Sequence, residues 1–265
     1  MELTGKTALV TGATGGLGRA IARALHAEGA TVMITGRRAE LLEELVGELG
    51  DRAESLPADL SSADDVRALC ERAGTVDVLV ANAAVPGSGA LTDYTPEQID
   101  RAIDVNLRSV IHLTRTLMPS MRERGSGHLI YISSISGKVA SPNASLYNAT
   151  KFGLRGFSLA LHDELRGSGV GCTTIFPGFI EGAGMFADSG MEAPSGAGTR
   201  SPEDVAQAVL KALRKNPREI DVASVMLRSG GWLTGISPAL VAAIQRAGGG
   251  AEKSADLAEA QRAKR

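Results

Sequence analysis

The sequence predicts an α/β fold in which helices cover both faces of a doubly wound parallel sheet of about seven strands. Three observations support this prediction. Short runs rich in β-branched residues alternate with helical patterns along nearly the whole chain of 265 residues, which is typical of repeated strand-helix-strand units. No Pro- or Ser-rich linker and no fixed-period repeat interrupts the alternation, so we expect a single domain. The composition, 43% hydrophobic and 22% charged, is ordinary for a globular protein with a large core.

The strands follow from short apolar runs, and the segments between them have helical patterns. In residues 17–29, for example, Ile21, Ala24 and Leu25 fall on one helix face, and Gly29 follows the C-terminal end. We expect the seven strands at residues 7–12, 31–36, 53–59, 76–83, 127–134, 171–178 and 218–224, the last of which has the weakest pattern.

The expected domain covers residues 1–247. Within it, residues 178–200 are rich in Gly, Ala and Ser with a few large apolar residues, which fits a mobile loop over a substrate site. Residues 223–247 are expected to form a C-terminal helical extension, with an apolar helix that starts near Pro238. Residues 248–265 are charged and Ala-rich, and we expect them to be a flexible tail.

Charge and composition argue against several classes of function. The net charge is -2, and no stretch interleaves basic and aromatic residues, so we expect no nucleic-acid partner. No apolar run is long enough to span a bilayer, and the N-terminus leads directly into a strand pattern, so we expect no membrane partner and a cytoplasmic location. Cys70 and Cys172 lack a CxxC spacing, and the histidines show no metal-ligand spacing, so we expect no disulfide framework and no metal.

A glycine-rich loop, TGATGGLG at residues 11–18, follows the first strand and opens the first helix. In this position Gly12 allows a tight turn, Gly16 allows the backbone to approach a pyrophosphate at the helix N-terminus, and Gly18 allows close helix-strand packing. The alternative is a glycine-rich turn that binds nothing. We expect cofactor contacts from the whole loop, namely from Gly12, Thr14, Gly16, Leu17 and Gly18.

Two arginines after the second strand favour NADP(H) as the cofactor, with NAD(H) as the alternative. Gly36 stands where an NAD-binding domain usually carries an acid for the ribose hydroxyls, and Arg37 and Arg38 follow it. A guanidinium at this edge can bind a 2′-phosphate by charge-assisted hydrogen bonds. The alternative is that the two arginines only begin a solvated helix.

Polar residues also follow the third and fourth strands. Asp59, with its neighbour Leu60, stands where a carboxylate could face an adenine, although the same stretch could simply start a helix that Ser61 or Ser62 caps. Asn82 and Ala83 end the fourth strand, where parallel strands leave a crevice for a ligand.

Tyr147 and Lys151 in SLYNATKFG are four residues apart, so on a helix they share one face. A nearby ammonium lowers the pKa of a phenol, and a shift of roughly 3 units from ~10 would make the tyrosine a proton donor and acceptor near neutral pH. The alternative is an ordinary surface pair on an amphipathic helix.

Taken together, these motifs resemble the short-chain dehydrogenase/reductase family, of the shorter single-domain type. The resemblance covers about residues 4–222 and rests on TGxxxGxG, the NAA-like tripeptide at Asn82, a serine before YxxxK, and the PG turn after the sixth strand. It implies a Rossmann-like fold and NAD(P)-dependent hydride transfer between the cofactor and a small-molecule carbonyl or alcohol substrate. It also implies a homodimer or homotetramer.

The resemblance assigns roles to individual residues. Tyr147 would be the acid or base of the reaction, and Lys151 would lower its pKa and hold the nicotinamide ribose. Ser134, in preference to Ser133 and Ser136, would hydrogen-bond the substrate oxygen. Asn106 would anchor a water beside Lys151, although without the resemblance we would expect a helical asparagine satisfied by backbone. The turn that would fix the nicotinamide carboxamide consists of Pro177, Gly178 and Ile180.

Three departures from the family pattern change what the resemblance implies. Gly182 replaces a hydroxyl residue that often contacts the cofactor in this family. Gly15 replaces a basic residue that many NADP-binding members carry, so the NADP(H) prediction depends mainly on Arg37. The C-terminal extension replaces a glycine-rich turn that packs across a tetramer interface in many relatives. Its Trp232 is open to three roles, which we rank as core packing, a subunit contact and a substrate wall.

The preferred interpretation is an NADPH-dependent carbonyl reductase, or the reverse alcohol dehydrogenase. The alternative is a catalytically silent NADP(H)-binding sensor, although such proteins usually lose the tyrosine or the lysine. A third alternative, a sugar-nucleotide epimerase or dehydratase, shares the tyrosine and the lysine but would have a longer chain with a larger C-terminal substrate region. We expect a medium-sized, largely apolar substrate, with walls drawn from Ser136, Lys138, Val139, Ala140, Asn143, Phe179, Met185 and Phe186.

Overall fold

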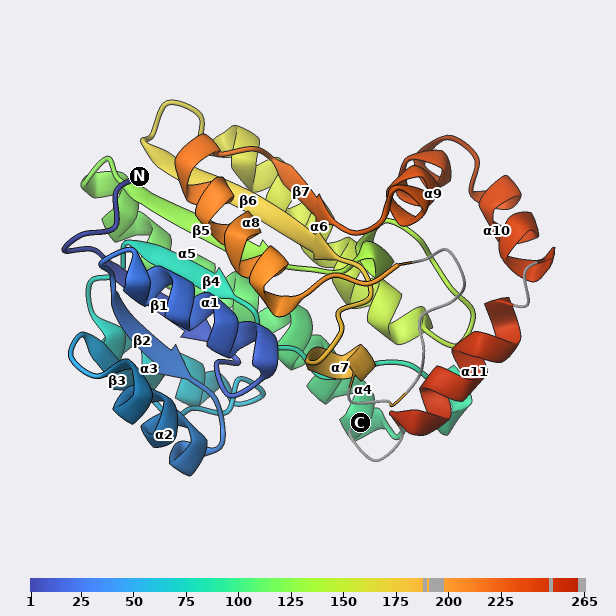
Figure 1. Ribbon diagram of the computed structural model, residues 1–265, viewed down its shortest axis with the longest axis horizontal. Helices are drawn as coiled ribbons and strands as arrows, with labels where there is room; N and C mark the ends of the chain where they lie inside the picture. Colours follow the sequence, from blue (N-terminus) through green and yellow to red (C-terminus); the bar gives the residue numbers. More distant parts are fainter. Residues whose placement is uncertain (188–189, 191–197, 248–249, 262–265) are drawn as a thin grey trace.

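The structure is a computed structural model, and it describes residues 1–187, 190, 198–247 and 250–261. Its centre is one parallel sheet of seven strands in the order β3-β2-β1-β4-β5-β6-β7 (Figure 1). All seven predicted strands are present, and the α/β fold class is confirmed. Their bounds are β1 Thr7–Thr11, β2 Thr31–Thr35, β3 Ala53–Ser55, β4 Val78–Ala81, β5 Gly127–Ile132, β6 Val170–Pro177 and β7 Glu219–Val222.

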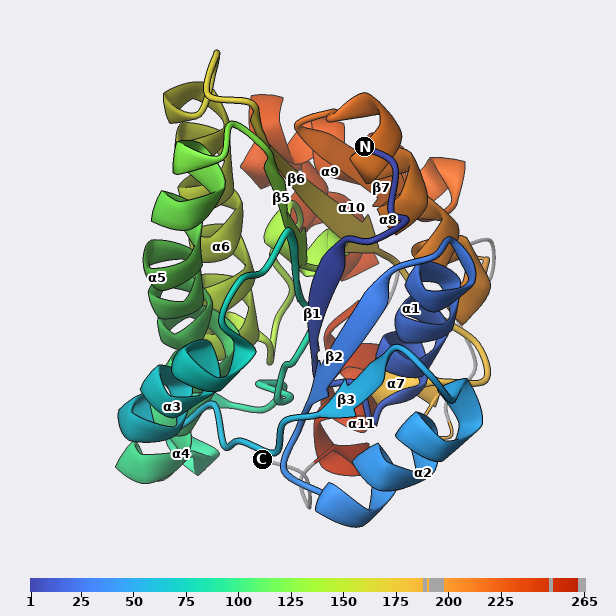
Figure 2. The same ribbon diagram turned by 90° about the vertical axis from the view of Figure 1, so that its left-hand side faces the viewer.

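Helices cover both faces of the sheet, as Figure 2 shows: α1, α2 and α8 lie on one side, and α3, α5 and α6 lie on the other. β1 explains why both faces are needed, because Val10 points into one core cluster and Leu9 into the other. Such strands, buried on both faces, appear in a sequence as continuous apolar runs. The helix bounds are α1 Gly16–Ala27, α2 Ala39–Leu49, α3 Ala63–Ala73, α5 Ser109–Glu123, α6 Ser145–Glu164 and α8 Pro202–Lys215.

The order of the strands reverses between β1 and β4, which are hydrogen-bonded neighbours although β2 and β3 come between them in the sequence. In open α/β sheets the crevice at such a reversal, beyond the carboxyl ends of the strands, is where ligands bind. Four strands end at this edge, at Thr11, Ala81, Ile132 and Pro177. Each of these residues is a candidate site residue or lies close to one in the sequence.

The connection between β4 and β5 is helical, but it is not one regular helix. It runs through α4 (Pro96–Ile103), a π-helical turn (Asp104–Arg108) and then α5. A capping box between Thr95 and Gln98 starts α4. Such π-turns inside helices are often found at functional sites, and Asn106, a predicted site residue, lies within this one.

Three helices follow the last strand and form what we call the C-terminal arm: α9 Val225–Ile236, α10 Pro238–Ala247 and α11 Gly250–Ala260. Figure 1 shows the arm beyond the carboxyl ends of the strands, on the side of the sheet where β7 lies, with α11 returning towards α7 (Gly184–Ala187). The expected tail at 248–265 therefore contains a helix, for which its Ala, Glu and Leu residues have high propensity. Among the described residues, no helix is long and apolar enough to cross a membrane.

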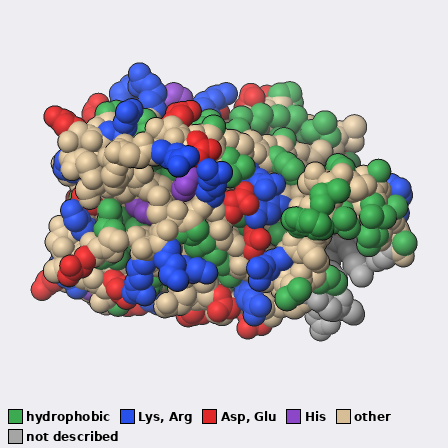
Figure 3. Space-filling view, turned by 90° about the horizontal axis from the view of Figure 1, so that it is seen from above, with side chains coloured by type: hydrophobic (Ala, Val, Ile, Leu, Met, Phe, Trp, Pro, Cys, Tyr) green, Lys and Arg blue, Asp and Glu red, His purple; other side chains and the backbone are tan. Residues whose placement is uncertain are grey.

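The outer surface of the arm is apolar, and green side chains gather there in Figure 3. Trp232 is 71% exposed, so core packing, the first role considered for it, is wrong. The other strongly exposed apolar residues of the arm are Val225, Met226, Ile236, Leu240 and Ile244.

Candidate active site

The glycine loop forms a tight turn between β1 and α1. Gly12 has a positive φ of 66°, and a Cβ on it would lie 2.7 Å from the Cα of Ala83. A Cβ on Gly18 would lie 2.7 Å from the Cα of Ala13, so only glycine allows this approach of helix and loop. A Cβ on Gly16 would overlap the Cβ of Ala183, which lies in the loop after β6.

Asn82 and Thr11 hold the glycine loop against the end of β4. The Asn82 side chain donates to the carbonyl oxygens of Thr11 (2.9 Å) and Gly12 (3.2 Å). The buried Thr11 hydroxyl accepts hydrogen bonds from the backbone N–H groups of Asn82 and Ala83. Asn82 therefore positions the loop backbone, a role that nothing in the sequence except its location indicates.

Positive charge gathers at the ends of β2 and β3. Arg38 donates to the Thr14 hydroxyl at 3.1 Å, while Arg37 and Arg101 lie near Asp59. Burial raises the pKa of Asp59, but hydrogen bonds from the backbone and hydroxyl of Ser61 and the two nearby guanidinium groups outweigh burial and leave that pKa below its ordinary value. Arg101, in α4, was not predicted as a site residue, because its distance in sequence from Asp59 hides their proximity.

The turn after β3 starts a helix and also contributes Asp59 to the cavity. Ser62 caps α3, as one alternative proposed, and one Asp59 oxygen accepts hydrogen bonds from Ser61. Asp59 nonetheless lines the cavity described below.

Tyr147, Ser134 and Lys151 meet at the carboxyl ends of β5 and β6. The Tyr147 hydroxyl is hydrogen-bonded to the Ser134 side chain, and the Lys151 Nζ lies 5.6 Å from the centroid of the Tyr147 ring. Lys151 is 2% exposed and donates to the carbonyl oxygen of Ile132 at 3.2 Å. The predicted helix is α6, and it places the tyrosine and the lysine one turn apart, as their spacing requires.

The pKa values of this pair differ from the expectation. Burial raises the pKa of Tyr147 to about 12, and the hydrogen bond with Ser134 opposes this shift only in part. Burial lowers the pKa of Lys151 to about 8. The expected lowering of the tyrosine pKa by the lysine is therefore absent from this structure, because burial disfavours the charged form of both groups.

Asn106 is buried, and its side-chain hydrogen bonds go to the backbone of Val85 and to Thr150. Its side chain accepts from the backbone N–H of Val85 at 2.8 Å and donates to the Val85 carbonyl at 3.0 Å, with a longer hydrogen bond to Thr150. This is the backbone-satisfied asparagine that the sequence offered as the alternative. Its hydrogen bonds tie the π-helical turn to the loop after β4.

Asn148, next to the tyrosine, was not predicted as a site residue. It donates to the carbonyls of Ser136 (2.6 Å) and Val139 (2.9 Å) and accepts from the N–H of Ser141. These bonds hold the segment that runs from the short helix η3 (Ile135–Gly137) to residue 141 against α6. The position of Asn148 immediately after Tyr147 is the only sequence signal that could have found it.

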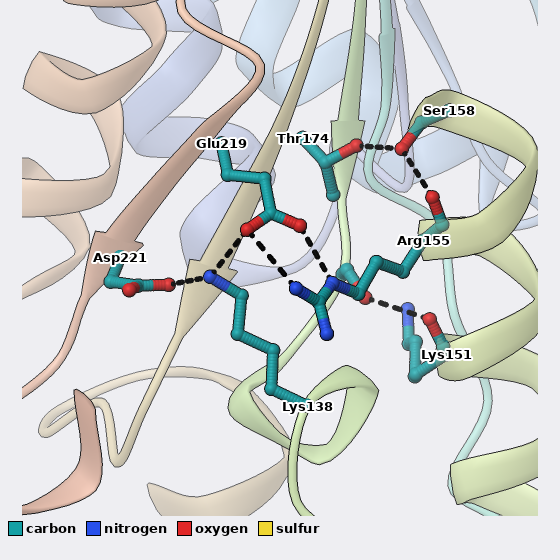
Figure 4. Close-up of polar contacts among 8 residues, drawn as sticks. Lys138, Lys151, Arg155, Ser158, Thr174, Glu219 and Asp221 are labelled. Carbon is teal, nitrogen blue, oxygen red and sulfur yellow. Dashed lines mark hydrogen bonds and ion pairs between the residues drawn. The ribbon is translucent and has the colours of Figure 1, made fainter. Parts of the chain in front are cut away.

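A partly buried ion network lies near Lys151, as Figure 4 shows. The Lys138 Nζ lies 2.9 Å from Glu219 and 2.6 Å from Asp221, and Arg155 binds the other oxygen of Glu219 at 2.6 Å. The Lys138 side chain is 8% exposed and its Nζ lies 4.1 Å from the centroid of the Phe176 ring. The network joins η3, α6 and β7, so Lys138 is not the substrate wall that we expected.

The loop after β6 is closed at its base and folds back over the glycine loop. Ile180 pairs with Arg200, and the backbone N–H of Arg200 donates to the carbonyl of Phe179 at 2.9 Å. Phe179 also contacts Phe186 of α7, with ring centroids 4.6 Å apart. Residues 188–189 and 191–197 of the expected substrate loop, together with the Met185 side chain, lie outside the described part of the structure.

A cavity of about 1060 Å³ joins these parts. Every predicted site residue lines it except Asn106. Of the predicted substrate walls with described side chains, Lys138 and Ala140 do not line it. The walls that do are Ser136, Val139, Asn143, Phe179 and Phe186.

The residues present fit a nicotinamide dinucleotide. Gly12 and Gly18 leave a cradle that a Cβ would fill, and α1 begins with no side-chain cap and no acidic residue in its first turn, which suits a pyrophosphate. Arg37 and Arg38 line the cavity beyond this cradle, while Tyr147 lines it on the other side.

Comparisons with known proteins agree with this geometry. Residues 6–193 match the family model described as short chain dehydrogenase. The chain is 39% identical over 227 residues to the ketoacyl reductase HetN of Nostoc sp., covering 83% of this chain and 79% of the relative.

Two solved structures are similar along most of their length. One is the 3-ketoacyl-(acyl-carrier-protein) reductase from Brucella melitensis complexed with NADH, at 31% identity and a TM-score of 0.74, with 83% of this chain and 97% of that chain covered. The other is the closed form of serine dehydrogenase complexed with NADP+, also at 31% identity and a TM-score of 0.74, with 83% and 95% covered.

Proposed function

Because this chain belongs to the short-chain dehydrogenase/reductase family, we propose that it is an NADP(H)-dependent oxidoreductase that interconverts a carbonyl compound and its alcohol. The observation that carries this proposal is the meeting of Tyr147, Ser134 and Lys151 on the wall of the cavity that also contains the glycine loop. A bound nicotinamide supplies or accepts the hydride.

Tyr147 supplies the proton in the direction of reduction. With its pKa raised to about 12, its phenol is neutral at physiological pH and holds the proton that a carbonyl oxygen needs as it becomes an alcohol. In the direction of oxidation the same group, once deprotonated, accepts the proton of the alcohol, so Tyr147 serves both directions.

Ser134 orients the reacting oxygen. Its hydroxyl oxygen accepts a hydrogen bond from the N–H of Ser136, so its own proton is free to donate toward Tyr147 or toward a substrate oxygen. Lys151, fixed by the Ile132 carbonyl, lies one helical turn away and supplies positive charge beside the phenol when it is protonated.

The charge at the adenosine end supports NADP(H) over NAD(H). Gly36 offers no carboxylate to ribose hydroxyls, whereas Arg37, Arg38 and Arg101 line this part of the cavity. The nearby acid, Asp59, is engaged by Ser61. A 2′-phosphate would find guanidinium donors here.

The relatives suggest where the search for a substrate should begin. The Nostoc relative is named a ketoacyl reductase and the Brucella structure a 3-ketoacyl-(acyl-carrier-protein) reductase, so β-keto esters are the first series to assay. A homodimeric or homotetrameric state and a cytoplasmic location also remain predictions of the family resemblance.

The test is the consumption of NADPH and NADH with ketones, aldehydes, quinones and β-keto esters, for the native protein and Tyr147→Phe. We expect NADPH to be preferred and kcat/KM to fall about 10³-fold in the variant, because general-acid catalysis is lost. NADPH binding, monitored by the fluorescence of NADPH, should persist in the variant. Full activity of Tyr147→Phe would refute the mechanism, and NADPH binding without turnover of any compound would favour the sensor.

A further inference from the structure

We propose that the C-terminal arm forms a subsite for a long, linear apolar tail of the carbonyl substrate, next to the reactive residues. This inference names a substrate class for the proposed function and therefore rests on it. It is more specific than the medium-sized, largely apolar substrate expected from the sequence, because it assigns the far end of the cavity to an extended chain.

Charge is distributed unevenly along the cavity. Its charged lining residues other than Lys151 are Arg37, Arg38, Asp59 and Arg101, and three of these follow strands at the adenosine end. In the described part of the arm, by contrast, no charged side chain lines the cavity. The apolar side chains that the arm contributes are Met226, Leu227, Leu233, Val241, Ile244 and Leu257, and the uncharged polar residues that line the cavity there are Gln245, Ser254 and, directly after α11, Gln261.

The arm is attached directly beside the reactive residues. A methyl carbon of Leu227 lies 3.1 Å from where a Cβ on Gly178 would be, at the turn after β6. Gly231 is the other point of contact, because a Cβ on it would lie 3.3 Å from the Lys138 Cβ on the segment that follows Ser134. The apolar walls of α9 are thus continuous with the site of the carbonyl group.

The apolar walls are incompletely covered by the protein itself. Met226 is 49% exposed and Ile244 is 56% exposed, although both line the cavity. An apolar chain between α9 and α10 would remove these side chains from water, and this burial favours binding by an amount that grows with each methylene. A short or charged substrate would gain nothing from the same walls.

Two glycines of α9 provide a matched pair of variants. A Cβ on Gly230 and a Cβ on Gly235 would each meet nothing within 4 Å, so a side chain can begin at either position without a clash at its Cβ. Only Gly230 lines the cavity. Gly230→Phe should therefore fill the subsite, while Gly235→Phe makes the same change on the same helix away from it.

The experiment measures kcat/KM with NADPH for methyl esters of β-ketobutanoate, β-ketohexanoate, β-ketooctanoate, β-ketodecanoate and β-ketododecanoate, below micelle-forming concentrations. For the native protein we expect a rise of about three- to fourfold per methylene until the subsite is filled. Gly230→Phe should lower the value for the longest ester at least tenfold and that for the shortest ester less than twofold. Gly235→Phe should change neither.

Calorimetric binding of the same β-keto methyl esters, with NADP+ present so that no hydride transfer can occur, separates the two proposals. Turnover of the esters with no dependence on length, or an equal loss for all lengths in Gly230→Phe, would overturn the tail subsite and leave the proposed function intact. Tight binding of only the long esters, lost in Gly230→Phe but without turnover in the native protein, would support the subsite and overturn the proposed function. Binding without preference for length would overturn the subsite.

Discussion

Lys151 and Tyr147 illustrate how burial controls the chemistry of single residues in this protein. Both are enclosed, and burial drives each toward its neutral form: the pKa of the lysine falls to about 8 and that of the tyrosine rises to about 12. The phenol thereby keeps its proton, while the lysine is left close to its titration point at physiological pH. A modest change in its surroundings would shift its charge.

This state of Lys151 predicts a pH-dependent stability. The unfolded chain holds the lysine proton up to about pH 10.5, whereas the folded protein releases it near pH 8. Between these values the unfolded state binds more protons, so the contribution of Lys151 to stability rises with pH, by about 3 kcal/mol over the whole window. We expect the free energy of unfolding of the native protein, minus that of Lys151→Met, to increase between about pH 8 and about pH 10.

Urea unfolding at several pH values provides the measurement, and Lys211→Met, at an exposed position of α8, provides the control. The control should follow the native protein across the window. Parallel pH profiles of the native protein and Lys151→Met would contradict the lowered pKa of the lysine. The window ends near pH 10 because the lysine of the unfolded chain, with an ordinary pKa of 10.5, begins to lose its proton there.

The sequence predicted site residues where a short motif carries them and missed those that the fold brings together. Gly12, Tyr147 and Lys151 could be found because their spacing is local. Arg101 and Asp59 meet only through the fold, and the hydrogen bonds of Asn148 depend on how the segment after Ser134 turns. The pKa of Tyr147 was also mispredicted, since the sequence shows the neighbouring charge but not the burial.

At the scale of elements, the ion network of Lys138 connects the parts that carry the site. Lys138 follows η3, Arg155 lies on α6, and Glu219 and Asp221 lie on β7. Burial raises the pKa of Glu219, but hydrogen bonds from Arg155 and Lys138 outweigh it and leave that pKa below its ordinary value. The carboxylate is therefore charged in the fold, and loss of either cation would leave it partly buried with only one ion-pair partner.

Removal of the Lys138 ammonium should destabilise the protein strongly. We expect Lys138→Met to lower the free energy of unfolding by about 3 kcal/mol, because Asp221 loses its ion pair and Glu219 keeps only Arg155. The double variant Lys138→Met, Asp221→Leu should recover part of this loss. Since Glu219 is stabilised as a carboxylate, the difference from the native protein should shrink as the pH falls below 4.5.

Urea unfolding at neutral and acidic pH measures these differences. The matched control is Arg218→Met, which breaks an ion pair with Asp163 whose two side chains are 53% and 51% exposed. Such a pair contributes about 0–1 kcal/mol. If Lys138→Met lowers the free energy of unfolding by no more than this control does, the network contributes no more to stability than an exposed ion pair.

Helices and strands were predictable to different degrees. The central strands stand out in the sequence because strands covered on both faces are continuous apolar runs, as in β5, where every residue is buried. The π-helical turn before α5 has no such pattern, and the arm helix α11 was expected to be a flexible tail. In both cases the hydrophobic pattern is weak, and it is the pattern rather than propensity that identifies an element.

At the scale of the whole molecule, the protein divides into a rigid sheet and an arm with few buried residues. Strands β4, β5 and β6 are buried throughout, and two core clusters cover the two faces of the sheet. Within the arm, Gly231 is the only buried residue of α9 and Val241 the only one of α10. Segments with few buried contacts open locally, without unfolding of the whole domain.

Amide hydrogen exchange should therefore separate the arm from the sheet. We expect α9 and α10 to take up deuterium by local opening, while the central strands exchange only when the domain unfolds. A bound apolar tail would bury the cavity-lining side chains of the arm and so reduce its opening. With NADP+ and methyl β-ketododecanoate, a pair that cannot react, uptake in α9 and α10 should fall well below that with NADP+ and methyl β-ketobutanoate.

Gly230→Phe tests whether this protection arises in the cavity, because its side chain would occupy the space of the tail. The long ester should give no added protection in Gly230→Phe and full protection in Gly235→Phe. Equal protection of the arm by the long and the short ester would show that closure follows occupancy of the carbonyl site alone. Protection by NADP+ alone would assign the ordering of the arm to the cofactor, since the arm would then close without any contact between its apolar walls and a substrate chain.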